Sequence, residues 1–596
     1  MSADKNKSVF GLLHALWLHI KSRRRSQLLA LIFLTMVVSV AEIVSIGAIL
    51  PFLGALTAPE KILDIQFLQP IFNWLNILEP AQLLLPMTIL FIGAAILSGI
   101  MRLILLWTQT RFGFAIGADI SISVYRHSLY LPYSAHVSKN SSEFISGITN
   151  KTALVVTQII LPILLIISAS IIFMAIFITL LLVDSSVAII ATLGFGGTYS
   201  IVLFLTKKQL LTNSNSISIK SNLLIKSLQE GFGGIRDVLI DGTQEVYCKI
   251  FRDVDIPLRK AQAGIVIIGQ TPRFIVEAIG ITILALLALY LSMRPDGISG
   301  AIPVLGVFAL AAQRLLPIIQ QIYQSWTSII GCNALLKDIL FYLNQGLPKY
   351  AELPSPSPIK FNKFIRLENL NFRYSPKEPS IIKGFSYKIK KGEKIGLIGP
   401  TGGGKSTLID IVIGLLFQQD GKLYIDDQLI SKNNYRSWQA HISHVPQNIF
   451  LADTTILENI AFGILPADID YDLVYDSAKK AQILETIESW NLKFNTLVGE
   501  RGVKLSGGQR QRIGIARALY KQTDVIIFDE ATSALDNRTE AKVIDSIFNL
   551  DPEITILIIA HRLTTLKNCT QVIELSEGRI SQSGSYQEII GKNNGK

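Results

Sequence analysis

A glycine-rich stretch ending in lysine, serine and threonine offers the clearest chemistry in this sequence. It reads Gly-Pro-Thr-Gly-Gly-Gly-Lys-Ser-Thr over 399–407 and follows the short apolar run 395–398. Glycines let backbone amides converge on phosphate oxygens, a lysine reaches the β and γ phosphates, and a serine hydroxyl can ligate Mg²⁺. The spacing predicts a phosphate-binding loop between a strand and a helix. Its candidate nucleotide-binding residues are Gly399, Thr401, Gly402, Gly403, Gly404, Lys405, Ser406 and Thr407.

Two adjacent acids form the second chemical feature. Asp529 and Glu530 end the apolar run 525–528, which is typical of a buried strand. An acid in this position can bind Mg²⁺ or its waters, and a second acid beside it can accept a proton from an attacking water. Taken alone, the pair is equally compatible with a helix cap. Beside the phosphate loop, it predicts a site that hydrolyses ATP.

Between these motifs stands the pentapeptide Leu-Ser-Gly-Gly-Gln at 505–509. Here the sequence closely resembles the ATP-binding cassette (ABC) family, whose signature this is. Further elements of the family occur in its order along the chain: an adenine-stacking Tyr374, a Q-loop Gln447, a D-loop at 533–536 and a switch His561. As isolated residues these would more often be packing side chains, and their order favours the functional assignment.

The resemblance implies the roles of the site residues. It assigns catalysis to Glu530, His561 and Gln447, and Mg²⁺ binding to Ser406, Gln447 and Asp529. It also assigns nucleotide contacts to the signature residues, which are Ser506, Gly507, Gly508 and Gln509. In this family two cassettes meet head to tail around ATP, so a chain with one cassette is expected to dimerise. The intact motifs favour an identical second subunit, and a heterodimer is the alternative.

The remainder of the chain must hold this cassette at a membrane. Of 596 residues, 49% are hydrophobic and only 17% charged, whereas soluble domains carry about a quarter charged residues. This composition excludes a disordered chain and a wholly soluble enzyme. We expect six membrane spans, each long enough for a hydrocarbon core of about 30 Å. They lie at 27–55, 82–107, 153–183, 186–206, 263–293 and 299–330.

The charge distribution predicts the orientation. The net charge is +11, and basic residues gather at 21–25 before the first span and in the stretches after the second and fourth. The positive-inside rule then places both termini in the cytosol, in the cytoplasmic membrane. Because the basic surplus follows membrane spans, we expect no nucleic-acid partner.

Two amphipathic helices are expected outside the spans. An apolar stripe at 10–20 predicts a helix along the inner membrane surface. A second stripe at 71–78 predicts a short outer helix, which either packs as an anchor or receives a lipid tail.

These elements predict a fold class and its domains. We expect an all-α six-helix transmembrane exporter domain followed by an α/β P-loop ATP-binding cassette domain. The boundaries are a transmembrane domain at 1–345, a proline-rich linker at 346–359 and a cassette at 360–596. This order resembles the exporter branch of the family, and ATP and Mg²⁺ are the implied cofactors.

Within the exporters, the membrane half resembles the bacterial lipid-linked oligosaccharide flippases of protein N-glycosylation. The resemblance rests on Ala-Glu-Ile at 41–43, Leu-Pro-Phe-Leu at 50–53, Pro-Arg at 272–273 and Arg-Leu-Leu-Pro at 314–317. It implies an ATP-driven flippase for a phosphate-bearing lipid, with membrane lipids and an anionic lipid-linked substrate as partners. The alternatives are an exporter of drugs, peptides or lipid A-like glycolipids, and a cassette protein that regulates without transport.

Three arginines inside the predicted spans are the candidate substrate residues. Arg102, Arg273 and Arg314 each cost about 2.5 to 3.5 kcal/mol near a bilayer centre, so they need a partner or a wet cavity. We expect them to line the translocation pathway and to bind a phosphate or pyrophosphate group. The alternative is neutralisation by Glu42 and Glu277.

Overall fold

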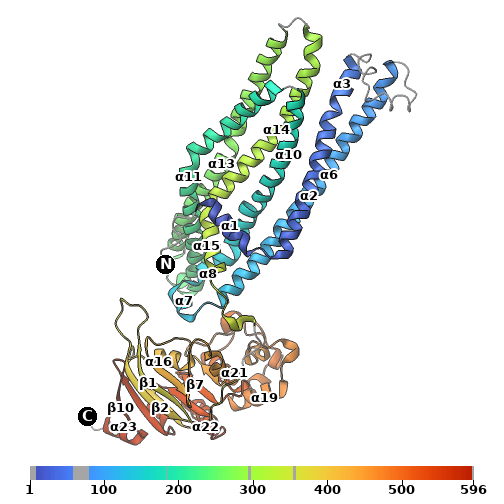
Figure 1. The fold of residues 1–596 in the computed structure, drawn as a ribbon. Coiled ribbons are helices and arrows are strands. Elements are labelled where there is room, and N and C mark those ends of the chain that lie inside the picture. Colours follow the sequence, from blue (N-terminus) through green and yellow to red (C-terminus); the bar gives the residue numbers. More distant parts are fainter. Residues whose placement is uncertain are drawn as a thin grey trace. The chain divides into compact units, whose positions relative to one another are not determined.

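The computed structural model describes residues 8–57, 80–183, 185–292, 297–352, 357–560 and 562–593 (Figure 1). The chain divides into two compact units. The helical unit comprises Met1–Leu131 with Ser138–Leu347, and the cassette unit comprises Pro132–Val137 with Pro348–Lys596. Every described element of the helical unit is a helix, whereas the cassette unit contains two β-sheets. The predicted fold class is confirmed.

Long helices dominate the helical unit. In Figure 1, α3 continues the line of α2 and α6 runs beside both, while α10, α11, α13 and α14 pack against one another. The helices are α1 (Val9–His19), α2 (Ser22–Gly47), α3 (Ile49–Thr57), α6 (Leu84–Leu129), α8 (Ser141–Ser146), α9 (Thr152–Val155), α10 (Leu161–Val183), α11 (Ser185–Gly233), α12 (Ile235–Ile240), α13 (Gln244–Ser292), α14 (Gly297–Gly331) and α15 (Asn333–Leu343).

Helices cover all six stretches predicted to span a membrane. Within the described residues, four helices are long and apolar enough to cross one: Ser22–Gly47, Leu84–Leu129, Ser141–Thr179 and Gln244–Thr282. The predicted total of six stays a prediction. The outer helix predicted at 71–78 lies outside the described residues, as do 353–356 of the predicted linker.

The first predicted span differs from the expectation of one continuous helix at 27–55. It is split at Ala48 into α2 and α3. The reason is Pro51, which has no N–H to donate to the carbonyl of Gly47 and crowds that carbonyl.

Two further prolines free carbonyls that α14 then engages. Pro162 cannot donate to the carbonyl of Gln158, and the hydroxyl of Ser328 lies 3.0 Å from that carbonyl oxygen and 2.5 Å from the Oε1 of the same residue. Likewise, Pro272 leaves the carbonyl of Ile268 without its helical donor, and the Tyr323 hydroxyl donates to it at 3.1 Å. Hydroxyl groups of α14 therefore contact both carbonyls that these prolines leave without a helical donor.

The helix that leads into α10 contains two π-helical turns, η2 (Gly147–Lys151) and η3 (Val156–Ile160). The side chain of Lys151 is only 4% exposed and forms an ion pair with Asp338 of α15. The hydroxyl of Ser218 in α11 donates to the same carboxylate at 2.5 Å. A single carboxylate thus joins η2, α11 and α15.

The cassette unit contains a four-stranded antiparallel sheet of order β2-β1-β4-β5 and a six-stranded sheet of order β10-β9-β3-β8-β7-β6. The strands are β1 (Phe364–Phe372), β2 (Ile382–Lys390), β3 (Lys394–Ile398), β4 (Asp420–Ile425), β5 (Gln428–Leu429), β6 (Ile442–Val445), β7 (Val525–Asp529), β8 (Thr555–Ile559), β9 (Gln571–Ser576) and β10 (Arg579–Gly584). The helices are α16 (Lys405–Ile413), α17 (Tyr435–Gln439), α18 (Ile456–Ile460), α19 (Tyr471–Lys480), α20 (Leu484–Glu488), α21 (Gly507–Tyr520), α22 (Asn537–Phe548) and α23 (Tyr586–Asn593).

Parallel pairing in the larger sheet gathers the predicted motifs. Strands β6, β7, β8 and β3 are parallel neighbours, with Val445 paired to Phe528 and Gly396 paired to Ile558. The carboxyl ends of parallel strands share one edge, which is where open α/β sheets bind ligands. The loops after β3, β6 and β7 therefore emerge together.

Candidate nucleotide-binding site

The phosphate-binding loop runs from β3 into α16, as predicted. Gly404 precedes the helix with a φ of 98°, and no side chain caps the helix N-terminus. A Cβ at Gly399 would lie 2.0 Å from the carbonyl oxygen of Leu575, and its φ is 141°. Glycine is therefore required at both positions, and the uncapped amides of α16 remain available to an anion.

Lys405 and its neighbours line this loop. The Nζ of Lys405 donates to the carbonyls of Gly399 and Pro400 at 2.8 and 3.0 Å, which holds the ammonium over the loop. Ser406 is exposed, whereas Thr407 is buried. The hydroxyl of Tyr374 lies 3.3 Å from that of Thr407, and its ring is 45% exposed. Tyr374 thus combines a fixed position beside the loop with an open aromatic surface.

The acids lie at the end of β7 next to the Q-loop. Asp529 ends the strand, and Glu530 follows with a φ of 53°. The Nε2 of Gln447 donates to the Oε2 of Glu530 at 2.5 Å. The structure therefore brings two of the predicted catalytic residues into direct contact. The third, His561, lies outside the described residues.

A further carboxylate in α16 was missed by the sequence reasoning. Burial, followed by the nearby negative charge of Asp529, raises the pKa of Asp410 to about 6. Asp410 therefore lies within electrostatic range of Asp529, which is one of the predicted Mg²⁺ ligands. Only the position of Asp410 in the helix that follows the phosphate loop could have signalled it.

These residues fit ATP with Mg²⁺. The amides of 402–407 and the ammonium of Lys405 would hold the phosphates, and Ser406, Gln447 and Asp529 would hold the metal. When bound, Mg²⁺ supplies charge neutralisation to the phosphate oxygens. Glu530 stays the predicted acceptor of the proton from water.

The signature segment caps α21 and packs on the D-loop. The backbone amide of Gln509 donates to the Ser506 hydroxyl at 3.2 Å, and the Ser506 amide donates to the Gln509 side chain at 2.8 Å. This reciprocal pair is a capping box. A Cβ at Gly507 or Gly508 would lie 3.3 Å from Ala534 or 3.2 Å from Leu535, so the glycines permit close contact with the D-loop.

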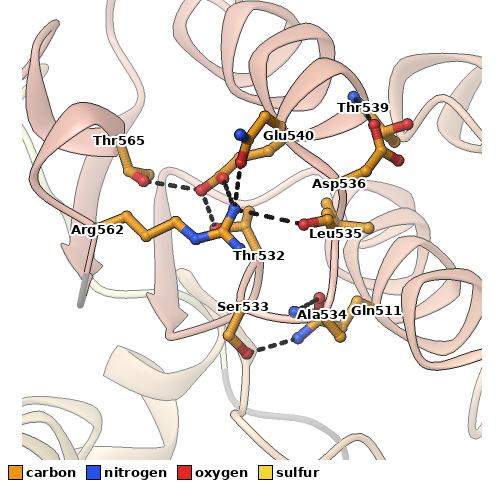
Figure 2. A network of polar contacts seen from close by, with 11 residues as sticks. Gln511, Thr532, Ser533, Ala534, Leu535, Asp536, Thr539, Glu540, Arg562 and Thr565 are labelled. Atoms are coloured by element: carbon orange, nitrogen blue, oxygen red, sulfur yellow. Dashed lines mark hydrogen bonds and ion pairs between the residues drawn. The ribbon is translucent and has the colours of Figure 1, made fainter.

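Gln511 fixes the D-loop to α21, and its role was also missed from the sequence. Its Nε2 donates to the Ser533 hydroxyl at 3.1 Å, and its Oε1 accepts from the Ala534 amide at 2.9 Å (Figure 2). The side chain is buried. The only sequence signal for this contact was that Gln511 lies two residues after the signature, in the helix that the signature begins.

A buried carboxylate, Glu540, organises the other side of the D-loop (Figure 2). The hydroxyls of Thr532 and Thr565 donate to its Oε1 at 2.9 and 2.8 Å, and Arg562 donates to its Oε2 at 2.5 Å. Arg562 follows the predicted switch position directly and also donates to the carbonyl of Leu535 at 3.4 Å. The network joins the segment after β8 to the D-loop.

In the helical unit, two of the predicted substrate arginines form ion pairs. Arg102 pairs with the fully buried Glu42 between α6 and α2, and the Ser98 hydroxyl donates to the same carboxylate at 2.7 Å. The Nε of Arg273 lies 2.7 Å from the Oε1 of Glu277. The side chain of Arg314 lies outside the described part of the chain.

Arg273 borders a polar cavity of about 230 Å³ between α11, α13 and α14, and Arg102 does not line it. The Tyr199 hydroxyl donates to the Gln320 side chain at 2.9 Å within this lining. The polar lining residues are Tyr199, Arg273, Glu277, Gln320, Gln321 and Gln324.

Comparisons with known proteins match both units of the fold. Residues 382–533 match the family model described as ABC transporter. The chain is 36% identical over 283 residues to an ATP-dependent lipid A-core flippase of Francisella tularensis, which covers 48% of this chain and 46% of the relative. It is 37% identical over 258 residues to the mitochondrial iron-sulfur clusters transporter ATM1 of Debaryomyces hansenii, covering 42% and 37% respectively. The chain thus spans about half or less of the length of these curated relatives.

A solved structure extends the likeness to nearly the whole fold. A bacterial Atm1-family ABC exporter with ATP bound superimposes with a TM-score of 0.77 at 22% identity, covering 96% of each chain. The chain therefore has the fold of this ABC exporter, a helical unit and a cassette unit, and residues 382–533 of the cassette unit match the ABC transporter family model.

Proposed function

We propose that this protein is an ABC half-transporter that hydrolyses ATP and moves an amphiphile with an anionic headgroup across the cytoplasmic membrane. The ATPase part is supported by the phosphate loop, the acid pair and the Q-loop, which meet at one edge of the larger sheet. Glu530 acts as the proton acceptor, and its contact with Gln447 holds it at the Q-loop.

The proposal of an anionic headgroup rests on the cavity beside Arg273. Arginine offers a planar fork that suits phosphate oxygens, and the amides of Gln320, Gln321 and Gln324 can donate to and accept from sugar hydroxyls. Charged and polar side chains at this depth favour a headgroup pathway over a lipid-facing surface. A lipid-linked oligosaccharide is the substrate class that combines a phosphate, hydroxyls and an apolar tail.

The second candidate is a lipid A-like glycolipid, because one relative is named a lipid A-core flippase. Both substrates carry phosphate and sugar, so the cavity suits either. Drug or peptide export and a non-transporting role are the remaining alternatives.

We further propose a homodimer with cytosolic termini. The turn between α11 and α13 exposes apolar side chains, with Phe232 at 71%, Leu239 at 60% and Ile240 at 69%. Large apolar side chains exposed together in one short segment favour a protein interface. An identical second subunit would cover it and supply the second cassette.

The test is ATPase stimulation of the reconstituted protein by polyprenyl-pyrophosphate glycans, lipid A-like glycolipids, drugs and peptides. Arg273→Ala should abolish stimulation by the phosphate-bearing lipids and preserve the basal rate. Arg259→Ala is the matched control, because Arg259 lies on the same helix and pairs with Asp255 at 3.2 Å through the same spacing. Stimulation by drugs or peptides alone, or equal effects of both variants, would refute the headgroup pathway.

A further inference from the structure

A second polar cavity, of about 150 Å³, lies where α1, α2 and α6 meet the end of α15. It is separate from the cavity beside Arg273 and from the nucleotide site. Its polar lining residues are His19, Lys21, Arg24, Asp119, Ser123 and His127.

The charge balance of this cavity is positive. The Nε of Arg24 lies 2.8 Å from Asp119, and the Nζ of Lys21 lies 3.7 Å from the same carboxylate. One carboxylate therefore faces two permanent cations. The Lys21 side chain is 67% exposed, so its ammonium is accessible from outside.

Two histidines complete the polar lining, and each already donates its ring N–H to a protein oxygen. The Nε2 of His19 donates to the side-chain oxygen of Asn344 at 2.9 Å, and the Nδ1 of His127 donates to the carbonyl of Ser123 at 2.7 Å. Each ring thus has one nitrogen fixed by a protein acceptor. The second nitrogen of each ring has no hydrogen-bond partner among the described residues.

The helix beside the cavity is built to lie at a membrane surface. Leu12 and Leu16 of α1 are buried against the bundle, whereas Phe10 is 69% and Leu18 62% exposed. The guanidinium of Arg25 lies 5.1 Å from the centre of the Trp17 ring and donates to the Trp17 carbonyl at 3.0 Å. An apolar outer face with a tryptophan next to basic residues is typical of an interfacial helix.

The end of α15 indicates which membrane surface this is. Leu343 lines the cavity and ends the last helix before the cassette strands begin at Phe364. ATP is supplied from the cytosol, so this step rests on the proposed function and places the cavity at the cytosolic surface. Basic pockets at that surface bind anionic lipid headgroups.

We propose that this cavity binds the phosphodiester headgroup of an anionic phospholipid from the cytosolic leaflet. Lys21 and Arg24 supply the charge, since Asp119 neutralises only one of them. The acyl chains lie along the exposed apolar face of α1.

The test measures lipid retention by the purified full-length protein with native mass spectrometry, without nucleotide. Micelles contain either phosphatidylglycerol or phosphatidylcholine. Lys21→Gln should weaken phosphatidylglycerol binding about five-fold, which corresponds to about 1 kcal/mol per basic residue near an anionic surface. Asp119→Asn should strengthen it, because it removes the competing carboxylate.

Arg23→Gln is the matched control, because it removes the same charge from an exposed residue that does not line the cavity. It should weaken binding clearly less than Lys21→Gln does. Equal weakening by Lys21→Gln and Arg23→Gln would overturn the site in favour of general surface attraction. If Asp119→Asn lowers the melting temperature, the comparison of Lys21→Gln with Arg23→Gln still tests the site.

A competition experiment identifies the source of the phosphate. Inorganic phosphate at matched concentration should not displace phosphatidylglycerol. Complete displacement would overturn the lipid assignment and identify a soluble anion site. Because no ATP or transported substrate is present, this outcome is independent of whether the protein transports lipids.

Discussion

The hydroxyl of Tyr323 in α14 donates to the carbonyl of Ile268 in α13 at 3.1 Å. In a regular helix the backbone N–H of residue 272 would donate to that carbonyl, but Pro272 has none. A side chain of α14 therefore replaces a backbone hydrogen bond of α13. The bond fixes α13 against α14 next to the cavity that Arg273 borders.

Tyr323→Phe should lower the free energy of unfolding by about 0.6 to 1.7 kcal/mol, the average and the maximum for hydrogen bonds between membrane helices. The loss arises because the Ile268 carbonyl is left without a donor. In a Pro272→Ala background the helix regains its own N–H, so the same substitution should cost less. Thermal unfolding in detergent measures both effects, and an equal cost in the two backgrounds would show that the carbonyl is not the cause.

Glu530→Gln should reduce ATP hydrolysis by at least about 100-fold and leave nucleotide affinity within a few-fold. Gln retains the shape of the side chain but cannot accept the proton of the attacking water. Phosphate release and fluorescent-nucleotide titration measure the two quantities. Glu553→Gln is the control, since Glu553 is an exposed acid paired with Lys391 at 3.0 Å. A Glu530→Gln variant with the parental rate would remove Glu530 as the base.

Gln511→Ala should lower both the stability of the cassette unit and the ATPase rate. Its removal takes away the acceptor of the Ala534 amide and the donor to the Ser533 hydroxyl, each worth about 0.5 to 1.5 kcal/mol, and it frees the D-loop. Gln482→Ala is the matched control, because Gln482 is exposed and bonds to Ser546 at 3.2 Å, away from the D-loop. A fall in stability with an unchanged rate would restrict Gln511 to a packing role.

In the absence of nucleotide, Asp410→Asn should raise the melting temperature. The increase should appear only at pH values where Asp410 of the parent protein is ionised. The folded pKa is about 6 against 3.8 for the unfolded chain. Between these two pKa values the folded state binds more protons than the unfolded state does. The free energy of unfolding therefore falls as the pH rises from one value to the other. The melting-temperature difference between variant and parent should be near zero at pH 4 and positive above pH 6. A constant difference across this range would show that the Asp410 charge is not the source.

Asp338→Asn should destabilise the helical unit more than Lys151→Met does. The asparagine leaves the buried Lys151 ammonium without its counter-ion, and removing one partner of a buried pair costs about 3 to 5 kcal/mol. Methionine replaces the buried charge with an apolar chain and leaves Asp338, which is 35% exposed, accessible to solvent. The double variant should recover part of the Asp338→Asn loss. Additive losses in a thermal-unfolding cycle would show that the two residues do not interact.

The sequence predicted the cassette in detail because its motifs are local. The phosphate loop from Gly399 to Thr407 requires glycines for backbone reasons alone, and the order of the sheet strands then brings Gln447 to Glu530. The contacts of Gln511 and Glu540 were not predictable in this way. Both resemble ordinary helix residues, and their partners arrive only through tertiary packing.

The helical unit was less predictable for the same reason. The break at Ala48 had a visible cause in Pro51, but the π-helical turns leave no residue signature. The sequence left two alternatives for Arg102, and its ion pair with Glu42 depends on how α2 lies against α6. Spacing within one helix, by contrast, was enough to indicate the contact between Arg273 and Glu277.

The π-helical turns η2 and η3 determine in which direction the side chains of α10 point. An α-helix advances about 100° per residue, so each inserted residue turns everything after it by that angle. Lys151 faces α15 before the second turn, whereas Ile176, beyond both, packs beside Ile46 and Leu315. Deleting one residue between 152 and 160 would rotate Ile176 about 100° away from those neighbours while Lys151 stayed in place. The π-helical turns thus allow one end of this helix to contact α15 while the other end packs against α2 and α14.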